Sequence, residues 1–405
     1  MAIDEVLAAA AQVDWRRLVE RALCDACLGR LFGKAGHGFT NPERGAAIRG
    51  AHGLPRGDPC WLCAGLMAEV PKFAEIAAAK LAPWDHRTFL VGSKIDPELA
   101  AREEALWIDL GLSCAEPVKS EVNREVGKLV AARTGKDVDF RHPDATAIVD
   151  TQFDVVEVTV APLFLYGRYR KLSRGIPQTR WPCRRCQGKG CDHCGGQGKM
   201  YATSVEEVVA AEVMKQTGGT GHALHGMGRE DVDARMLGNG RPFVVEVSEP
   251  RTRAVDLAAV AGAVNRSGLV EVEGLRPSNR DEVVALKDDR ADKSYRALVR
   301  FAGPVAVAKL NEALSIVAGS RIAQRTPTRV SHRRSDQVRH RTVRSLALLH
   351  AEGRDAEVLV TAEAGTYVKE LLHGDGGRTE PSLAGLLGVP CEVLELDVVR
   401  IHDGG

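Results

Sequence analysis

Eight of the ten cysteines in this chain form four Cys-x-x-Cys pairs, and this spacing constrains the fold more than any other feature. The pairs are Cys24 and Cys27, Cys60 and Cys63, Cys183 and Cys186, and Cys191 and Cys194. Such pairing in a chain of 405 residues is typical of metal binding rather than of a disulfide framework. Four thiolates enclose a zinc ion and leave no position open for catalysis. We therefore expect two structural zinc sites. The alternatives are a redox pair, or one zinc site with one oxidised or empty pair.

The cysteine pairs and the hydrophobic pattern divide the chain into three expected parts. Residues 1–64 form an N-terminal zinc-knuckle module. Residues 65–175 form a compact α/β unit, with strands at 89–92, 145–150 and 155–160 and a helix at 121–130. Residues 176–405 form the largest domain, with a four-cysteine knuckle inserted at 183–194. Its expected elements predict an α+β fold with a largely antiparallel sheet: strands at 296–301, 356–361 and 392–399, a helix at 305–314, and a helix capped by Ser204.

Composition excludes several classes of protein. The net charge is only +1, so binding of a polyanion depends on local basic patches. No apolar run approaches the roughly 18 residues that span a membrane, and the first residues carry acids where a signal peptide carries bases. We therefore expect a cytoplasmic protein with no membrane partner. No glycine-rich phosphate loop follows a strand, so no nucleotide cofactor is indicated.

Two segments have the composition of nucleic-acid-binding surfaces. Residues 166–174, with Arg180 and Trp181, interleave aromatic rings with cations, which suits base stacking and phosphate neutralisation. Residues 321–344 hold eight arginines and a single acid, Asp336. Arginine is well suited to phosphate recognition. For both segments we favour RNA contact over the alternative of a solvated basic surface.

Three short motifs in the last domain contain candidate catalytic groups. The first is Gly228-Arg229-Glu230-Asp231, where a neighbouring arginine favours an ionised carboxylate. The second is Lys293-Ser294-Tyr295, just before a strand. The third is Gly365-Thr366-Tyr367-Val368-Lys369, where a turn begins a short helix. Each motif alone has an ordinary explanation: a turn aspartate, a core tyrosine and a solvated lysine.

Taken in order, the three motifs resemble the core motifs of pseudouridine synthases. The longer segments 228–243 and 324–334 are similar to the archaeal and eukaryotic tRNA pseudouridine synthases that modify the TΨC arm. The resemblance covers nearly the whole chain, because the N-terminal part resembles that family's accessory domain with its THUMP RNA-binding module. It implies a pseudouridine synthase domain with a mixed, largely antiparallel sheet. It also implies isomerisation of uridines 54 and 55 of tRNA without a catalytic cofactor.

The resemblance assigns roles to matching positions. Asp231 matches the catalytic aspartate, which attacks C1′ of the sugar or takes a proton from C2′. Tyr295 matches the tyrosine that stacks on the uracil and helps to move the C5 proton. Lys369 stands where related enzymes keep a basic partner for the aspartate, and Arg229 is a second such partner. With the arginine-rich segment, the expected substrate contacts are Tyr295, Tyr367, Arg229, Arg325, Arg329, Arg333 and Arg334.

Two other functions compete with this interpretation. A tRNA methyltransferase with a THUMP module needs a glycine-rich cofactor loop after a strand, and the sequence has none. A non-catalytic zinc-ribbon protein that binds tRNA accounts for the cysteines and arginines. It does not account for Asp231, Tyr295 and Lys369 in the order of one family.

Overall fold

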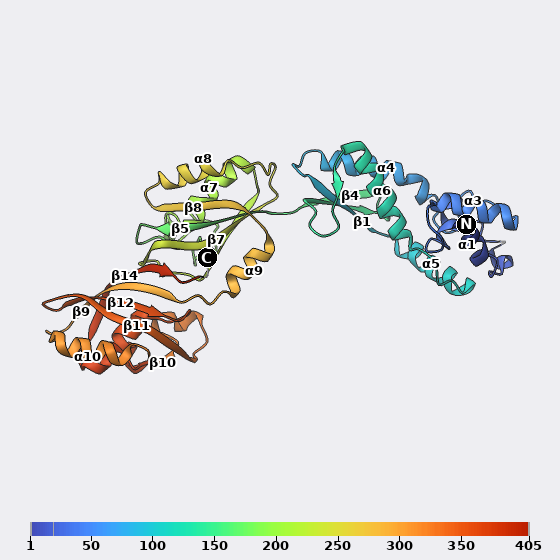
Figure 1. Ribbon diagram of the computed structural model, residues 1–405. Helices are drawn as coiled ribbons and strands as arrows, with labels where there is room; N and C mark the ends of the chain where they lie inside the picture. Colours follow the sequence, from blue (N-terminus) through green and yellow to red (C-terminus); the bar gives the residue numbers. More distant parts are fainter. Residues whose placement is uncertain (1, 19, 404–405) are drawn as a thin grey trace. The chain divides into compact units, whose positions relative to one another are not determined.

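The computed structural model describes residues 2–18 and 20–403, without the side chains of Ala2 and Arg333, and it divides the chain into two compact units (Figure 1). The first unit comprises residues 1–162 and 249–253, and the second comprises residues 163–248 and 254–405. Among the described residues, no helix is long and apolar enough to cross a membrane.

The first unit combines a helical N-terminal part with a four-stranded sheet. Its helices are α1 (Ala2–Ala10), η1 (Trp15–Leu18), α2 (Asp25–Arg30), α3 (Asn41–His52), α4 (Leu66–Leu81), α5 (Pro97–Leu110) and α6 (Val118–Thr134). The strands β1 (Thr88–Lys94), β2 (Asp137–Val138), β3 (Ala145–Asp150) and β4 (Val155–Val160) lie in the order β2-β1-β3-β4. The expected strands and the helix around 121–130 are confirmed. Thr40 and Glu43 form a reciprocal capping box that begins α3.

One hydrophobic core runs through the whole first unit, from Val6 to Val156. The side chain of Arg30 is 1% exposed, and it donates hydrogen bonds to Glu103 on α5 (3.1 Å) and to Glu121 on α6 (2.9 Å). A buried arginine with two carboxylate partners ties the cysteine-rich segment to the helices that follow it. The structure therefore differs from the expected boundary at residue 64, because both sides share one core.

The second unit is built on one large sheet. Its strands are β5 (Leu163–Lys171), β6 (Gly221–Gly226), β7 (Arg235–Ser248), β8 (Val270–Ser278), β9 (Lys293–Phe301), β10 (Arg321–Arg325), β11 (Val338–Glu352), β12 (Asp355–Ala362), β13 (Thr379–Glu380) and β14 (Cys391–Ile401). Their order is β13-β10-β11-β12-β9-β14-β7-β5-β8, with β6 beside β7. Between the described strands, the β14–β7 pair is parallel and the other pairs are antiparallel. The expected mixed, largely antiparallel sheet is confirmed.

Helices cover this sheet over two hydrophobic cores. Helices α7 (Val205–Thr217), α8 (Leu257–Asn265) and α9 (Arg280–Asp288) contribute to a core with β5, β7 and β8. Helices α10 (Val307–Val317), α11 (Val368–His373) and α12 (Leu383–Leu387) contribute to a second core with β9, β11 and β12. The remaining short helices are η2 (Asp192–Cys194), η3 (Thr328–Arg333) and η4 (Gly374–Gly377). Ser204 caps α7 as expected, because its hydroxyl accepts from the Glu207 amide.

The basic and aromatic segment at 166–174, which we expected to contact RNA, is a strand of the large sheet. Strand β5 lies between β7 and β8, and Tyr169 is fully buried. Arg168 pairs with Asp403 (2.6 Å), and Arg170 pairs with Glu271 (2.8 Å). Carboxylates from distant parts of the chain thus neutralise these cations. The expected domain end at residue 175 consequently falls inside the second unit.

Candidate active site

Asp231 lies on the loop of residues 227–234, which joins β6 to β7. Gly228 adopts a φ of +76°, in the left-handed region that glycine tolerates best. Buried Lys171 donates to the carbonyl oxygens of Asp231 (3.1 Å) and Val232 (3.0 Å). Gln178 Nε2 donates to the carbonyl oxygen of Gly228 at 3.0 Å. Side chains from neighbouring segments therefore fix the backbone on both sides of the Asp231 carboxylate.

The residue before Asp231 is buried and anchors the loop to the sheet. The Glu230 side chain is 0% exposed, and the Tyr169 hydroxyl donates to its carboxylate at 2.8 Å. Arg241 Nε lies 2.9 Å from Glu230 Oε2, and Arg241 Nη1 donates to the Met227 carbonyl. Burial opposes the charge on Arg241, but the nearby Glu230 carboxylate outweighs this effect and raises the pKa of Arg241. The sequence motif did not predict this role for Glu230.

Two cations face Asp231, and the shorter contact differs from the sequence expectation. Arg329 Nη1 donates to Asp231 Oδ1 at 3.0 Å. Lys369 Nζ lies 3.9 Å from Asp231 Oδ2 but only 2.6 Å from Asp233 Oδ2. Burial disfavours the charged form of Asp233, but the hydrogen bond from Lys369 outweighs it and lowers the pKa of Asp233. Arg329 is thus the hydrogen-bonding partner of the Asp231 carboxylate, and Lys369 bonds more closely to Asp233.

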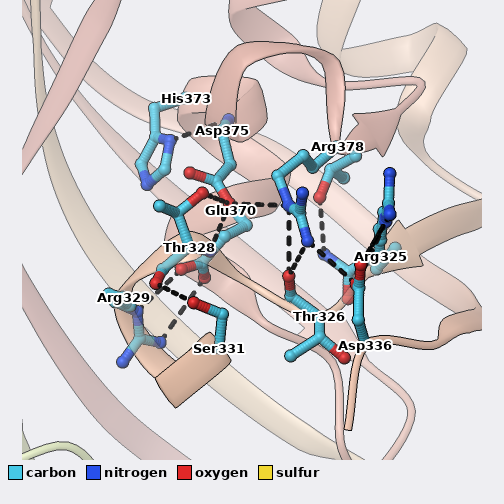
Figure 2. A network of polar contacts seen from close by, with 12 residues as sticks. Arg325, Thr326, Thr328, Arg329, Ser331, Asp336, Glu370, His373, Asp375 and Arg378 are labelled. Atoms are coloured by element: carbon cyan, nitrogen blue, oxygen red, sulfur yellow. Dashed lines mark hydrogen bonds and ion pairs between the residues drawn. The ribbon is translucent and has the colours of Figure 1, made fainter. Parts of the chain in front are cut away.

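Arg329 also bonds to a buried carboxylate on α11, directly after the third motif (Figure 2). Its Nε donates to Glu370 Oε1 at 2.7 Å, and the Glu370 side chain is 2% exposed. Burial opposes the charge on Arg329, but the bond to Glu370 and the nearby Asp231 outweigh it and raise the pKa of Arg329. The guanidinium therefore joins η3, α11 and the Asp231 loop. Glu370 directly follows Lys369 in the sequence, and this position next to the motif is the only sequence feature that indicated it as a site residue.

The two expected substrate tyrosines lie on separate elements. Tyr295 on β9 packs against both hydrophobic cores, and burial raises its pKa to about 12. The Asp231 and Glu230 charges also raise the pKa of Tyr295, whereas Arg241 lowers it. Tyr367 caps the start of α11, where its amide donates to Gln324 Oε1 at 2.9 Å. Gln324 Nε2 donates back to the Tyr367 carbonyl at 2.9 Å, so the third motif is held against β10.

The arginines expected to contact RNA have different surroundings. Arg325 pairs with Asp336 at 2.6 Å, and Arg229 lies with its guanidinium carbon 5.0 Å from the centre of the Trp181 ring. Arg334 is exposed, and the side chain of Arg333 lies outside the described residues. The arginine-rich segment is therefore not without counter-charge, because folding brings carboxylates from other segments to several of its members. Among these are Asp231, Asp292, Glu363 and Glu370.

The eight paired cysteines form two clusters, each with four sulfur atoms within 4.8 Å of one another. Cys24 and Cys63 are 3.9 Å apart between their sulfurs, as are Cys183 and Cys191. Tetrahedral zinc with bonds of about 2.3 Å separates its sulfurs by roughly 3.8 Å, so both clusters fit the ion. The first cluster comprises Cys24, Cys27, Cys60 and Cys63, and the second comprises Cys183, Cys186, Cys191 and Cys194. All cysteines are free of disulfide bonds among the described residues.

Comparison with protein families identifies the class of this protein. Residues 164–402 match the family described as "Pus10, C-terminal", and residues 73–150 match "Pus10 THUMP domain, archaeal". The motif-bearing unit is therefore that of a pseudouridine synthase, and it follows a THUMP domain. The expected pseudouridine synthase domain and THUMP module are confirmed.

Relatives along nearly the whole chain narrow the class to one family. A protein of Methanothrix thermoacetophila is 43% identical over 414 residues, covering 94% of this chain and 91% of the relative. A protein of Halorubrum lacusprofundi is 45% identical over 398 residues, covering 94% of this chain and 93% of the relative. Both are named tRNA pseudouridine synthase Pus10. The chain belongs to the Pus10 family, and the methyltransferase and zinc-ribbon alternatives receive no support.

A solved structure titled "Crystal Structure of a Cbf5-Nop10-Gar1 Complex" is also similar to part of this chain. The similarity has a TM-score of 0.32 and 25% identity, over 49% of this chain and 46% of that one.

Proposed function

We propose that this chain isomerises uridine to pseudouridine at positions 54 and 55 in the TΨC arm of tRNA, with Asp231 as the catalytic carboxylate. The observation that supports this role is the hydrogen bond of 3.0 Å between Arg329 and Asp231 on a loop anchored by buried side chains. A charge-assisted hydrogen bond from an arginine holds a carboxylate in a fixed orientation. Family membership supports tRNA as the substrate, since the relatives are named for it.

The reaction breaks the N1–C1′ bond, turns the uracil and rejoins it through C5. Extrusion of the base from the RNA stack costs roughly a few kcal/mol, and stacking on Tyr295 offsets part of that cost. Asp231 attacks C1′ or removes the C2′ proton, and neither step requires a metal ion or an organic cofactor. In this proposal Tyr295 also helps to move the C5 proton once the uracil has turned.

The cysteine clusters have a structural role in this proposal. Each offers four thiolates, which fill the coordination of zinc and hold the surrounding loops. Zinc therefore supports the fold of both units and takes no part in the isomerisation.

The test is conversion of an unmodified tRNA transcript, with pseudouridine mapped at single-nucleotide resolution. The wild-type protein is expected to modify positions 54 and 55, and Asp231→Asn is expected to abolish both products while it still binds tRNA. Asp355→Asn, on a partly exposed residue paired with Arg300, is the matched control and is expected to remain active. Activity of Asp231→Asn would contradict the catalytic role, and modification of other positions alone would contradict the TΨC assignment.

A further inference from the structure

The second cysteine cluster carries cations that no other part of the described chain neutralises. Arg184, Arg185 and Lys189 are exposed, and no ion pair or side-chain hydrogen bond is found for them among the described residues. Arg325, Arg329 and other cations of the second unit instead have carboxylate partners. Residues 180–199 hold five arginines and lysines and a single acid, Asp192. We call residues 183–198 the cysteine knuckle.

The backbone of the cysteine knuckle is tightly folded around its sulfurs. Gly190 N donates to Cys186 Sγ (3.2 Å), and Gly198 N donates to Cys194 Sγ (3.1 Å). A Cβ on Gly198 would lie 2.3 Å from the carbonyl oxygen of Gly188, and the φ of Gly198 is +68°. Glycine is therefore required where the two halves of the knuckle touch. A metal ion bound by the four thiolates makes the loop that carries the three cations rigid. The backbone therefore loses little entropy when these cations bind a ligand.

The base of the knuckle adjoins the loop that bears Asp231. Met200 N donates to the Trp181 carbonyl (2.9 Å), and Cys183 N donates to the Gly198 carbonyl (2.8 Å), which closes the knuckle. The Trp181 ring packs edge-on against Tyr201, with ring centres 5.5 Å apart. The guanidinium carbon of Arg229 lies 5.0 Å from the centre of the same Trp181 ring. Arg229 is two residues from Asp231, so the knuckle begins beside the catalytic loop.

We propose that the cysteine knuckle is an RNA-binding surface in addition to the site at Asp231. On it, Arg184, Arg185 and Lys189 bind substrate phosphates near the nucleotide held at Asp231. This inference rests on the proposed function. Residues 180–198 hold four cations, which exceed the two negative charges of a zinc tetrathiolate and the charge of Asp192, whereas Lys199 is paired with Glu207 at 2.8 Å. No residue of the knuckle has a large apolar side chain. Protein interfaces usually bury such side chains, so this composition fits a polyanion better than a protein partner.

The test compares two triple variants that each remove three positive charges from the full-length, zinc-loaded protein. The first is Arg184→Ala/Arg185→Ala/Lys189→Ala. The matched control removes three cations remote in sequence from the knuckle: Lys287→Ala/Lys309→Ala/Arg354→Ala. For each protein, the Kd for tRNA is measured over a series of salt concentrations, together with the single-turnover rate at saturating protein.

The knuckle variant is expected to bind tRNA at least roughly fivefold more weakly at 0.1 M salt, because one phosphate contact is worth about that factor. The slope of log K against log salt is expected to become shallower by about 0.7 for each lost contact. The saturated single-turnover rate is expected to remain near wild type, because Asp231 is untouched. Circular dichroism and zinc content establish that the variant is folded.

Several results would overturn the inference. These are an unchanged Kd and salt slope in the knuckle variant, an equal loss in the control variant, or no tRNA binding by the wild-type protein. The proposed function has a separate readout, since it fails when wild-type protein that binds tRNA forms no pseudouridine at positions 54 and 55. A wild type that modifies both positions, together with an unaffected knuckle variant, rejects the inference alone.

Discussion

Arg329 donates a hydrogen bond of 3.0 Å to Asp231 across a sequence separation of 98 residues, and the same guanidinium holds buried Glu370 at 2.7 Å. One planar side chain therefore connects the loop of residues 227–234 to α11. Arginine suits this position because its fork presents several donors in fixed directions. The orientation of the Asp231 carboxylate consequently depends on Arg329 and on the carboxylate that anchors it.

We predict that Arg329→Ala lowers the single-turnover rate by roughly a hundredfold, because a displaced Asp231 no longer meets the sugar in a productive geometry. Arg329→Lys keeps the charge but cannot reach both carboxylates, so it should recover only part of the rate. Loss of a partner for buried Glu370 should also destabilise the second unit by about 1–3 kcal/mol. Rates are measured with saturating protein, and stability by urea unfolding. Arg300→Ala is the control, because it removes an exposed pair with Asp355. A wild-type rate for Arg329→Ala would contradict the positioning role.

Glu230→Gln should destabilise the second unit by about 3–5 kcal/mol, since it leaves the buried charge of Arg241 without its partner. The free energy of unfolding is measured with a chemical denaturant. Glu271→Gln is the matched control, because its pair with Arg170 is partly exposed and should contribute about 0–1 kcal/mol. Equal effects of the two substitutions would show that Glu230 does not anchor the loop.

Lys293 predicts a pH dependence of stability. Burial, together with the nearby charge of Arg241, lowers the pKa of Lys293 to about 8 from its ordinary value of 10.5. Between pH 8 and 10.5 the unfolded chain binds more protons than the folded one. The free energy of unfolding therefore rises as the pH is raised through this range. Below pH 8 the penalty for burying the ammonium is fully present.

We therefore expect Lys293→Met to remove a rise in unfolding free energy of about 1 kcal/mol per pH unit across that window. Urea unfolding of wild type and variant at pH 7.5, 8.5 and 9.5 measures the difference between their slopes. Lys309→Met, on an exposed lysine of α10, should leave the wild-type slope intact. Identical slopes for wild type and Lys293→Met would contradict the lowered pKa.

Metal analysis should find two zinc ions per chain, one for each cysteine cluster. Cys60→Ser/Cys63→Ser should remove one ion and destabilise the first unit strongly, because both cysteines belong to its core. Cys191→Ser/Cys194→Ser should also remove one ion but affect thermal unfolding less, because this cluster belongs to neither core of the second unit. A single ion in the wild type would favour the alternative of one zinc site and one empty or oxidised pair.

Local sequence patterns predicted many elements of this fold correctly. Alternating hydrophobic residues marked β3, β4 and β12, and Ser204 with Glu207 marked the start of α7. These predictions succeeded because strand alternation and helix capping depend on residues close in the chain. The hydrophobic core shared across residue 64 and the place of residues 166–174 in the sheet depend instead on contacts between distant residues. Arg30 forms hydrogen bonds with Glu103 and Glu121, and Arg168 with Asp403, only after folding.

The sequence alone determined the family, the motif order and the two sets of four cysteines, because each is a matter of residue type and spacing. Tertiary structure decided which cation meets Asp231. Lys369 belongs to a recognised motif but bonds more closely to Asp233. Arg329 from the arginine-rich segment donates the hydrogen bond to Asp231. These charge pairs join residues far apart in the sequence, and their partners depend on how η3, α11 and the loop of residues 227–234 come together in the fold. The spacing of residues in the sequence does not predict this arrangement.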